Sequence, residues 1–196
     1  MPSRPQSLEI PARSASAPAP GEPIPSHYRY CFGCGADHPT GLHMQMTAGA
    51  DLTAVGRFTV TELHQGAPGL AHGGALASAI DDVLGGLNWL VGTPAVTGNL
   101  SVDYRRPVAV GQTLVISARI DGIQGRRVYT SADCFIDQLD GVMAVQATAV
   151  FIQVPIEHFT TFGNPEQVAQ AIVDRKSGGP AWRGDGTPDD QWEVNP

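Results

Sequence analysis

The sequence predicts an α+β domain in which an antiparallel sheet wraps around one long helix. Two observations lead to this prediction: several segments alternate apolar and polar residues as strands do, and only one long central segment has helical apolar spacing. That segment, residues 71–90, has leucine, isoleucine and valine at spacings of four and three (Leu76, Ile80, Val83, Leu87 and Leu90), with Leu84 beside them. The chain of 196 residues, 42% of them hydrophobic, is long enough for one sizeable core.

The predicted strands are five segments rich in β-branched residues, at 51–60, 95–104, 112–120, 126–136 and 142–154. Turn residues separate the last three (Asp121-Gly122, Gly125 and Asp140-Gly141), so these three form an antiparallel meander. Together the segments predict a sheet of about five to six strands, which packs one face on the helix.

The two ends of the chain differ in composition from its centre. Residues 1–26 are rich in Pro, Ser and Ala without an apolar period, and we expect a flexible tail. Residues 27–158 form the predicted domain. Residues 159–196 form an extension with a short helix at 165–176, capped by Asn164, and a flexible end that contains Trp182 and Trp192. Its apolar face carries Val168, Ile172 and Val173.

Charge and composition exclude several function classes. The chain has 12 Lys and Arg against 19 Asp and Glu, a net charge of -7, so we expect no nucleic-acid partner. It shows neither a secretory leader nor an apolar run of membrane-spanning length, so we expect no membrane partner and a cytoplasmic location. Three cysteines do not suggest a secreted disulfide framework.

Two adjacent carboxylates, Asp81 and Asp82, fall on opposite flanks of the helical apolar stripe, and periodicity alone does not choose between them. Their helical neighbours are small (Gly74, Ala75, Ala77, Ser78, Ala79, Gly85 and Gly86), so another backbone or a ligand can approach closely. At the helix start, the N–H groups of Gly73 and Gly74 can polarise a carbonyl. We expect His72 to cap or orient this turn rather than act as a base.

These features resemble the hotdog-fold acyl-CoA thioesterases of the phenylacetate-pathway (PaaI-like) type, in the 4-hydroxybenzoyl-CoA thioesterase superfamily. The resemblance rests on His72-Gly73-Gly74 followed by an aspartate nine residues after the histidine, and it extends over about residues 28–155. It includes four further motifs: Cys31-Phe32-Gly33-Cys34-Gly35, His64-Gln65-Gly66, Tyr104-Arg105-Arg106-Pro107 and Gly125-Arg126-Arg127-Val128.

The resemblance implies a hotdog fold and hydrolysis of an aryl- or fatty-acyl-CoA thioester. Asp81 takes the position of the family's catalytic carboxylate, as general base or nucleophile, and the Gly74 N–H that of the oxyanion donor. Thr97 matches a residue that positions water or substrate from a partner subunit, because family members place their sites in a homodimer, sometimes in a dimer of dimers. Relatives often have Asn or Gln six residues before the motif histidine; Gly66 stands there, with Gln65 one residue earlier.

Coenzyme A brings three phosphate groups, and the two arginine pairs, Arg105 with Arg106 and Arg126 with Arg127, are the candidates to bind them. Gly73 and Asp82 are further candidates for contacts with the substrate. Coenzyme A enters as part of the substrate, and we expect no separate cofactor. Two alternatives remain open: a non-catalytic acyl-CoA binding module, and a hydratase or dehydratase in which His72 does the chemistry.

Cys31 and Cys34, with His27, His38 and His43 nearby, raise the question of a zinc site. A structural zinc site usually needs four ligands, and the chain has only one Cys-x-x-Cys pair. We therefore expect a glycine-rich turn packed against the sheet, and no metal. Cys134 falls in a predicted strand and is expected in the core.

Overall fold

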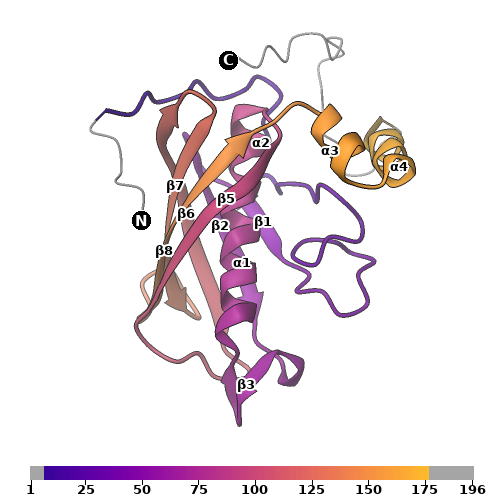
Figure 1. The fold of residues 1–196 in the computed structure, drawn as a ribbon. Coiled ribbons are helices and arrows are strands. Elements are labelled where there is room, and N and C mark those ends of the chain that lie inside the picture. Colours follow the sequence, from indigo (N-terminus) through magenta and orange to yellow (C-terminus); the bar gives the residue numbers. More distant parts are fainter. Residues whose placement is uncertain (1–6, 177–196) are drawn as a thin grey trace.

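The computed structural model describes residues 7–176, and its centre is a six-stranded antiparallel sheet in the order β1-β2-β6-β7-β8-β5. The sheet curves around one long helix (Figure 1). The strands are β1 (Gln45–Ala48), β2 (Thr53–Thr59), β5 (Ala95–Tyr104), β6 (Thr113–Gln124), β7 (Arg127–Ile136) and β8 (Met143–Gln153). The predicted α+β class, the five predicted strands and the β6-β7-β8 meander are confirmed.

The remaining elements lie around this centre. A small hairpin, β3 (Gln65–Ala67) with β4 (Leu70–Ala71), follows the 3₁₀ turn η1 (Glu62–His64) and leads into the long helix α1 (Gly73–Gly86). The short helix α2 (Asn88–Val91) comes next, and α3 (Glu157–Phe162) and α4 (Pro165–Lys176) end the described chain. Among the helices of residues 7–176, none combines the length and apolar character that crossing a membrane requires.

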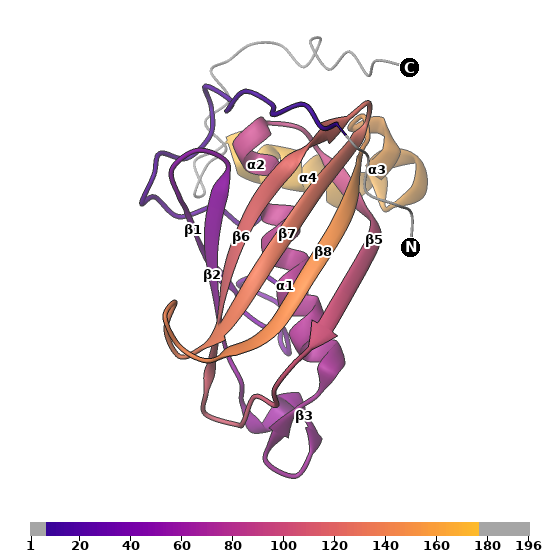
Figure 2. The same cartoon turned by 90° about the vertical axis from the view of Figure 1, so that its left-hand side faces the viewer.

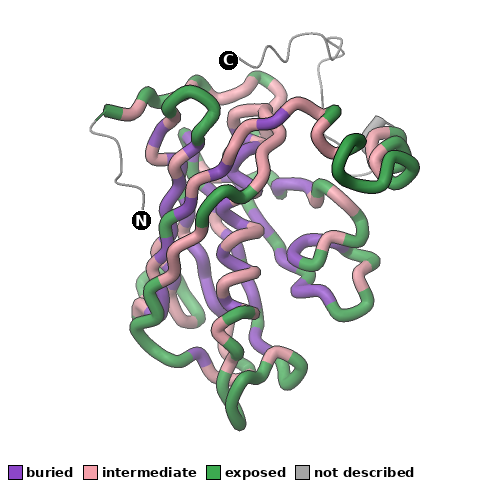
Figure 3. The backbone as a smooth tube through the Cα atoms, viewed as in Figure 1, coloured by how far each residue is buried: buried purple, intermediate pink, exposed green. Residues whose placement is uncertain are grey.

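The predicted helix over 71–90 is confirmed as α1 and α2, with a break between them. All six apolar residues of the predicted stripe are buried in the core. Figure 3 shows buried positions along the central helix. The break follows Gly85-Gly86, where the Asn88 side chain donates a hydrogen bond to the Gly85 carbonyl at 3.0 Å. A Cβ at Gly86 would lie 2.8 Å from the Met46 sulfur, so the glycine that weakens the helix also lets β1 approach it.

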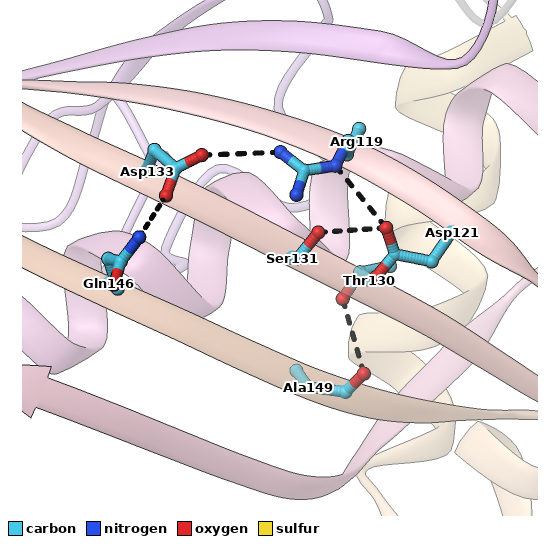
Figure 4. Close-up of polar contacts among 7 residues, drawn as sticks. All are labelled: Arg119, Asp121, Thr130, Ser131, Asp133, Gln146 and Ala149. Atoms are coloured by element: carbon cyan, nitrogen blue, oxygen red, sulfur yellow. Dashed lines mark hydrogen bonds and ion pairs between the residues drawn. The ribbon is translucent and has the colours of Figure 1, made fainter. Parts of the chain in front are cut away.

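Strand alternation gives the sheet two different faces. Val128, Ala132 and Cys134 of β7 join the core on the α1 side, which confirms Cys134 as a core residue. The residues between them, on the opposite face, form a polar network with β6 and β8 (Figure 4). In it, Ser131 donates to Asp121 at 2.9 Å, and Arg119 bridges Asp121 and Asp133, both at 3.3 Å. In Figure 2 the sheet is seen from this side, with α1 behind it.

Residues 7–26 differ from the flexible tail that their composition predicts. Glu9 pairs with Ile123, the Ser14 N–H donates to the Leu90 carbonyl at 2.8 Å, and the Ile24 N–H donates to Met46 at 2.9 Å. Backbone hydrogen bonds, the Arg13 side chain and the buried Ile24 hold this segment against the domain, and these scattered contacts leave no periodic pattern in the sequence. Residues 1–6, the rest of the predicted tail, lie outside the described residues.

The C-terminal extension contains the predicted helix over 165–176. The Gln167 N–H donates to the Asn164 side chain at 3.1 Å, which confirms the predicted cap. Helix α3 was not predicted. The expected flexible end, with Trp182 and Trp192, lies outside the described residues, and the boundaries at 27 and 158 stay predictions.

Candidate active site

Asp81 lies in the middle of α1, on the flank that faces the edge strand β5. The Thr97 hydroxyl of the same chain donates a hydrogen bond to Asp81 Oδ1 at 3.0 Å. The family resemblance led us to expect Thr97 from a partner subunit, whereas the structure brings both residues together within one chain. It also separates the two carboxylates that periodicity left equivalent, because Asp82 points instead toward the segment of Cys31 and Cys34.

The surroundings of Asp81 make its carboxylate more basic. Burial raises its pKa above the ordinary value, the hydrogen bond from Thr97 opposes this shift, and the nearby Cys31 thiolate adds to it. A carboxylate with a raised pKa is a better proton acceptor, provided that it stays ionised. Asp81 therefore has the character of a general base as well as that of a nucleophile.

Asp81 and Thr97 line a largely apolar cavity of about 570 Å³. Trp89 of α2 and Phe151 of β8 form its inner wall, and Phe159, Val168 and Ile172 close it from α3 and α4. Trp89 lines the cavity, whereas Val91, two residues later, packs on the core. The contribution of α3 and α4 was not anticipated, since no sequence pattern says where a C-terminal helix docks.

A second hollow, of about 420 Å³, meets the first at the same carboxylate. Phe32, Ala77, Ser78 and Leu100 line it, and it runs along the small-residue flank of α1. Asp81 and Thr97 belong to both hollows. The pair is therefore accessible from two directions, one largely apolar and the other bordered by small side chains.

At the start of α1, His72 is the N-cap residue, and the Gly74 N–H donates to its Nδ1 at 2.9 Å. This confirms the structural role that we expected for His72. It also means that the predicted oxyanion donor already has an acceptor. Gly73 accepts a hydrogen bond from the Tyr104 hydroxyl at 2.7 Å, which ties the helix start to the end of β5.

Gln65 lies in the β3-β4 hairpin beside this helix start. Its side-chain oxygen accepts from the Gly69 N–H at 2.7 Å, and its amide nitrogen donates to the Glu62 carbonyl at 3.0 Å. Both ends of the side chain thus close the hairpin. The structure gives Gln65 a structural role, and a direct role in chemistry would require it to break these bonds.

The two arginine pairs lie at opposite ends of the sheet. Arg105 and Arg106 directly follow Tyr104, which pairs with Val145 of β8, and Val145 in turn pairs with Cys134 of β7. Arg127 lies seven residues before Cys134 on the same strand. At about 3.3 Å per residue, the pairs are about 20 Å or more apart. Within one chain they do not form a single phosphate site.

Asp82 belongs to a different group of side chains. Ligand atoms of His27, Cys31, Cys34 and Asp82 all lie within 4.8 Å of one another. Cys31 Sγ is 3.5 Å from Asp82 Oδ1, and Cys34 Sγ is 3.5 Å from His27 Nδ1. The sequence showed the Cys-x-x-Cys pair and His27 but gave no signal for Asp82, which lies 51 residues after Cys31.

The electrostatics of this group are strongly coupled. A hydrogen bond from the Cys34 thiol, together with His27, lowers the pKa of Cys31 to about 3, and the same hydrogen bond raises that of Cys34. Burial and the Cys31 charge raise the pKa of Asp82 to about 7. Asp82 faces this cluster and also lines both hollows, so the contact with substrate that the sequence suggested for it stays a prediction.

The fold and sequence resemble those of known thioesterases. A family model described as the thioesterase superfamily matches residues 68–142. A solved thioesterase superfamily protein is 28% identical, covers 70% of each chain and has a TM-score of 0.59. The chain has the hotdog fold of these thioesterases, and its residues 68–142 are similar to the thioesterase superfamily. The Escherichia coli PaaI structure shares this fold at 19% identity and a TM-score of 0.53, over 58% of this chain and 80% of PaaI.

Among curated proteins, the hotdog domain is similar to acyl-coenzyme A thioesterases. It is 38% identical over 90 residues to THEM4 of Xenopus laevis, which covers 45% of this chain and 40% of that relative. THEM4 of Bos taurus is 36% identical over 98 residues, or 50% of this chain and 39% of the relative. The chain thus spans less than half the length of the curated relatives that it matches.

Proposed function

We propose that this chain hydrolyses acyl-coenzyme A thioesters. The observation that carries the proposal is the Asp81–Thr97 pair at the wall of an apolar cavity, next to an opening along α1. The cavity suits an acyl or aryl group, and the Asp81 carboxylate lies at its wall, where it would be next to the thioester of a bound acyl group. The proposed location is the cytoplasm, and water is the only co-reactant that the reaction needs.

In this reaction, Asp81 takes a proton from a water molecule that attacks the thioester carbonyl carbon. The oxyanion that forms collapses, the carbon–sulfur bond breaks, and the products are a free acid and the thiol of coenzyme A. Asp81 can instead attack the carbonyl carbon itself, which breaks the carbon–sulfur bond, expels the thiolate of coenzyme A and leaves an anhydride that water then hydrolyses. In both routes the Thr97 hydroxyl holds the carboxylate in place through its hydrogen bond.

The oxyanion donor proposed for this site comes from a second copy of the chain. Gly74 precedes Asp81 by seven residues of α1, which corresponds to about 10 Å along the helix axis. The N–H groups of a helix start also point toward its N-terminus, away from Asp81. One thioester carbonyl therefore does not reach the Gly74 N–H and the Asp81 carboxylate of the same helix. A homodimer, or a dimer of dimers, supplies the two halves.

The surface of the chain is consistent with such a dimer. β5 is an edge strand of the sheet, and its residues Thr97, Gly98 and Asn99 are exposed. The adjacent flank of α1 carries small side chains that let a second backbone approach. For the partner's Gly74 N–H to donate to a thioester carbonyl oxygen, it must share or release its present hydrogen bond to His72.

Relatives support the choice of substrate. The curated relatives are named acyl-coenzyme A thioesterases, and structures of a Streptococcus pneumoniae thioesterase include one with coenzyme A. Two further structures of that protein have alanine in place of an aspartate and of a threonine sixteen positions later, the separation of Asp81 and Thr97 here. The arginine pairs remain the candidates for the phosphates, each pair in a separate part of the dimer.

The test is the release of free coenzyme A thiol from a panel of aryl- and acyl-CoA thioesters. We expect turnover by the native chain and at least a 100-fold lower kcat for Asp81→Asn, about the contribution of a general base. Asp103→Asn is the matched control, because Asp103 is an exposed carboxylate on β5 outside both hollows. Tight binding of an acyl-CoA without turnover would instead favour the alternative, a non-catalytic acyl-CoA binding module.

A further inference from the structure

His27, Cys31, Cys34 and Asp82 form a compact group beside the proposed active site that the hydrolysis does not use. We propose that these four side chains bind a structural zinc ion. The sequence led us to expect no metal, because a single Cys-x-x-Cys pair offers too few ligands. The fold supplies the missing ones, His27 from just before the pair and Asp82 from α1.

Two of the distances in this group match those of tetrahedral zinc. Bonds of about 2.3 Å to sulfur and 2.0–2.1 Å to nitrogen or oxygen place a sulfur about 3.5 Å from a nitrogen or oxygen ligand of the same ion. Cys34 Sγ to His27 Nδ1 and Cys31 Sγ to Asp82 Oδ1 are both 3.5 Å. Thiolate and imidazole ligands in a four-ligand set favour zinc over magnesium or calcium.

The backbone between the two cysteines is shaped to bring both sulfurs to one point. The Cys31 N–H donates to the Tyr28 carbonyl and the Gly35 N–H donates to the Cys31 carbonyl, both at 2.9 Å, which folds the segment into successive tight turns. A Cβ at Gly33 would lie 2.3 Å from Asp82 Cγ, and one at Gly35 would lie 2.5 Å from the Cys31 backbone. Only glycine permits the turn to wrap this closely around Asp82.

Asp82 carries an unsatisfied atom in this group. Its Oδ2 is buried and has no hydrogen-bond partner among the described residues. No lysine or arginine within residues 7–176 forms an ion pair with it either. A buried carboxylate beside two thiols is costly unless a cation compensates the negative charge. A zinc ion bound by the four side chains would supply that charge and a ligand for the carboxylate.

A second layer of contacts orients the sulfurs. The Ser26 hydroxyl donates to Cys34 Sγ at 3.4 Å, and the Cys34 backbone N–H donates to the Cys31 sulfur. Such outer contacts fix metal ligands in place and are typical of metal sites. Because four protein ligands leave no open position, the ion is structural rather than catalytic. It fastens the segment around Cys31, Phe32 and Gly33, which lines the second hollow, to the helix that carries Asp81.

The test is the metal content of the full chain, purified without chelators and under reducing conditions, by inductively coupled plasma mass spectrometry. We expect about one zinc per chain, and its loss in the Cys31→Ser, Cys34→Ser double variant. Cys134→Ala is the control, because Cys134 is buried in β7 outside the group, and it should keep its zinc. Less than about a tenth of a zinc per chain after incubation with Zn²⁺, or zinc retained by the double variant, overturns the proposal.

A second measurement covers the case in which the double variant fails to fold. Co²⁺ added to the metal-depleted native chain should produce the charge-transfer absorption of a cobalt–thiolate site, and Zn²⁺ should displace it. Asp82→Asn should weaken zinc binding, measured by competition with a chelator, at least about tenfold, whereas the neighbouring Asp81→Asn should leave it unchanged. Absence of the thiolate band, or equal affinities for the two variants, contradicts the proposal. These readouts do not depend on thioester hydrolysis, so the two proposals fail separately.

Discussion

Asp81 and Asp82 are adjacent in the chain, yet one step of the helix turns their carboxylates by about 100° into different surroundings. Asp81 accepts a hydrogen bond from Thr97 and faces both hollows. Asp82 packs against Gly33 and the two cysteines. The segment next to each carboxylate therefore decides its surroundings. Asp81 lies beside the edge strand β5, and Asp82 lies beside the glycine-rich turn.

At this scale the prediction concerns Thr97. Replacing it with valine keeps the shape of the side chain but removes the hydroxyl that donates to Asp81 at 3.0 Å. A hydrogen bond to a charged group contributes about 1.5–3 kcal/mol, so we expect kcat for acyl-CoA hydrolysis to fall about tenfold or more, with little change in acyl-CoA affinity. Thr97→Ser retains the hydroxyl and should restore most of the rate. Equal rates for the valine and serine variants would remove Thr97 from the site.

Among the elements, α3 and α4 decide the shape of the apolar cavity. They follow the last strand and place Phe159, Val168 and Ile172 opposite Trp89 and Asp81. The cavity therefore has one wall from the sheet and central helix and another from the C-terminal extension. Under the proposed function, this arrangement makes the extension a determinant of which acyl groups fit.

We expect a larger side chain on α4 to change the acyl preference. Ile172→Trp should fill part of the cavity and lower kcat/KM for long-chain or aryl-CoA thioesters at least about tenfold relative to acetyl-CoA, since a few buried methylenes are each worth about 0.8 kcal/mol. Val173→Trp is the matched control on the next residue, because Val173 is 54% exposed and does not line the cavity. A similar profile for the two variants would show that α4 does not contact the acyl group.

Some of the elements follow directly from the sequence, and others depend on tertiary contacts. β5 begins and ends at the predicted residues, because Ala95–Tyr104 is bounded by Pro94 and Arg105-Arg106-Pro107, and α4 follows from its Asn164 cap. Residues 7–26 were missed because scattered contacts hold them, namely backbone hydrogen bonds and the single buried side chain of Ile24, and these leave no apolar period in the sequence. The grouping of Asp82 with Cys31 and Cys34 was missed as well, since tertiary folding alone brings together residues 51 positions apart.

For the whole molecule, the proposed chemistry requires two copies. One chain supplies the Asp81–Thr97 pair, and the Gly74 N–H of the same chain lies too far along α1 and points the wrong way. A two-fold symmetric dimer pairs each Asp81 with the partner's Gly74 and creates two equivalent sites. The edge position of β5 and the small-residue flank of α1 provide the surface for such a pairing.

The central claim, a thioester-hydrolysing site built from two chains, is tested most directly by mixing two inactive variants. Asp81→Asn removes the carboxylate, and Gly74→Pro removes the N–H at a helix start, where proline is tolerated. Each variant alone should release coenzyme A thiol from an acyl-CoA at 1% of the native rate or less, as a rough bound. After unfolding and refolding together in equal amounts, half of the dimers are mixed and each holds one intact site, so about a quarter of the native rate should return. No recovery above the separate variants, with dimers present, would contradict the two-chain site.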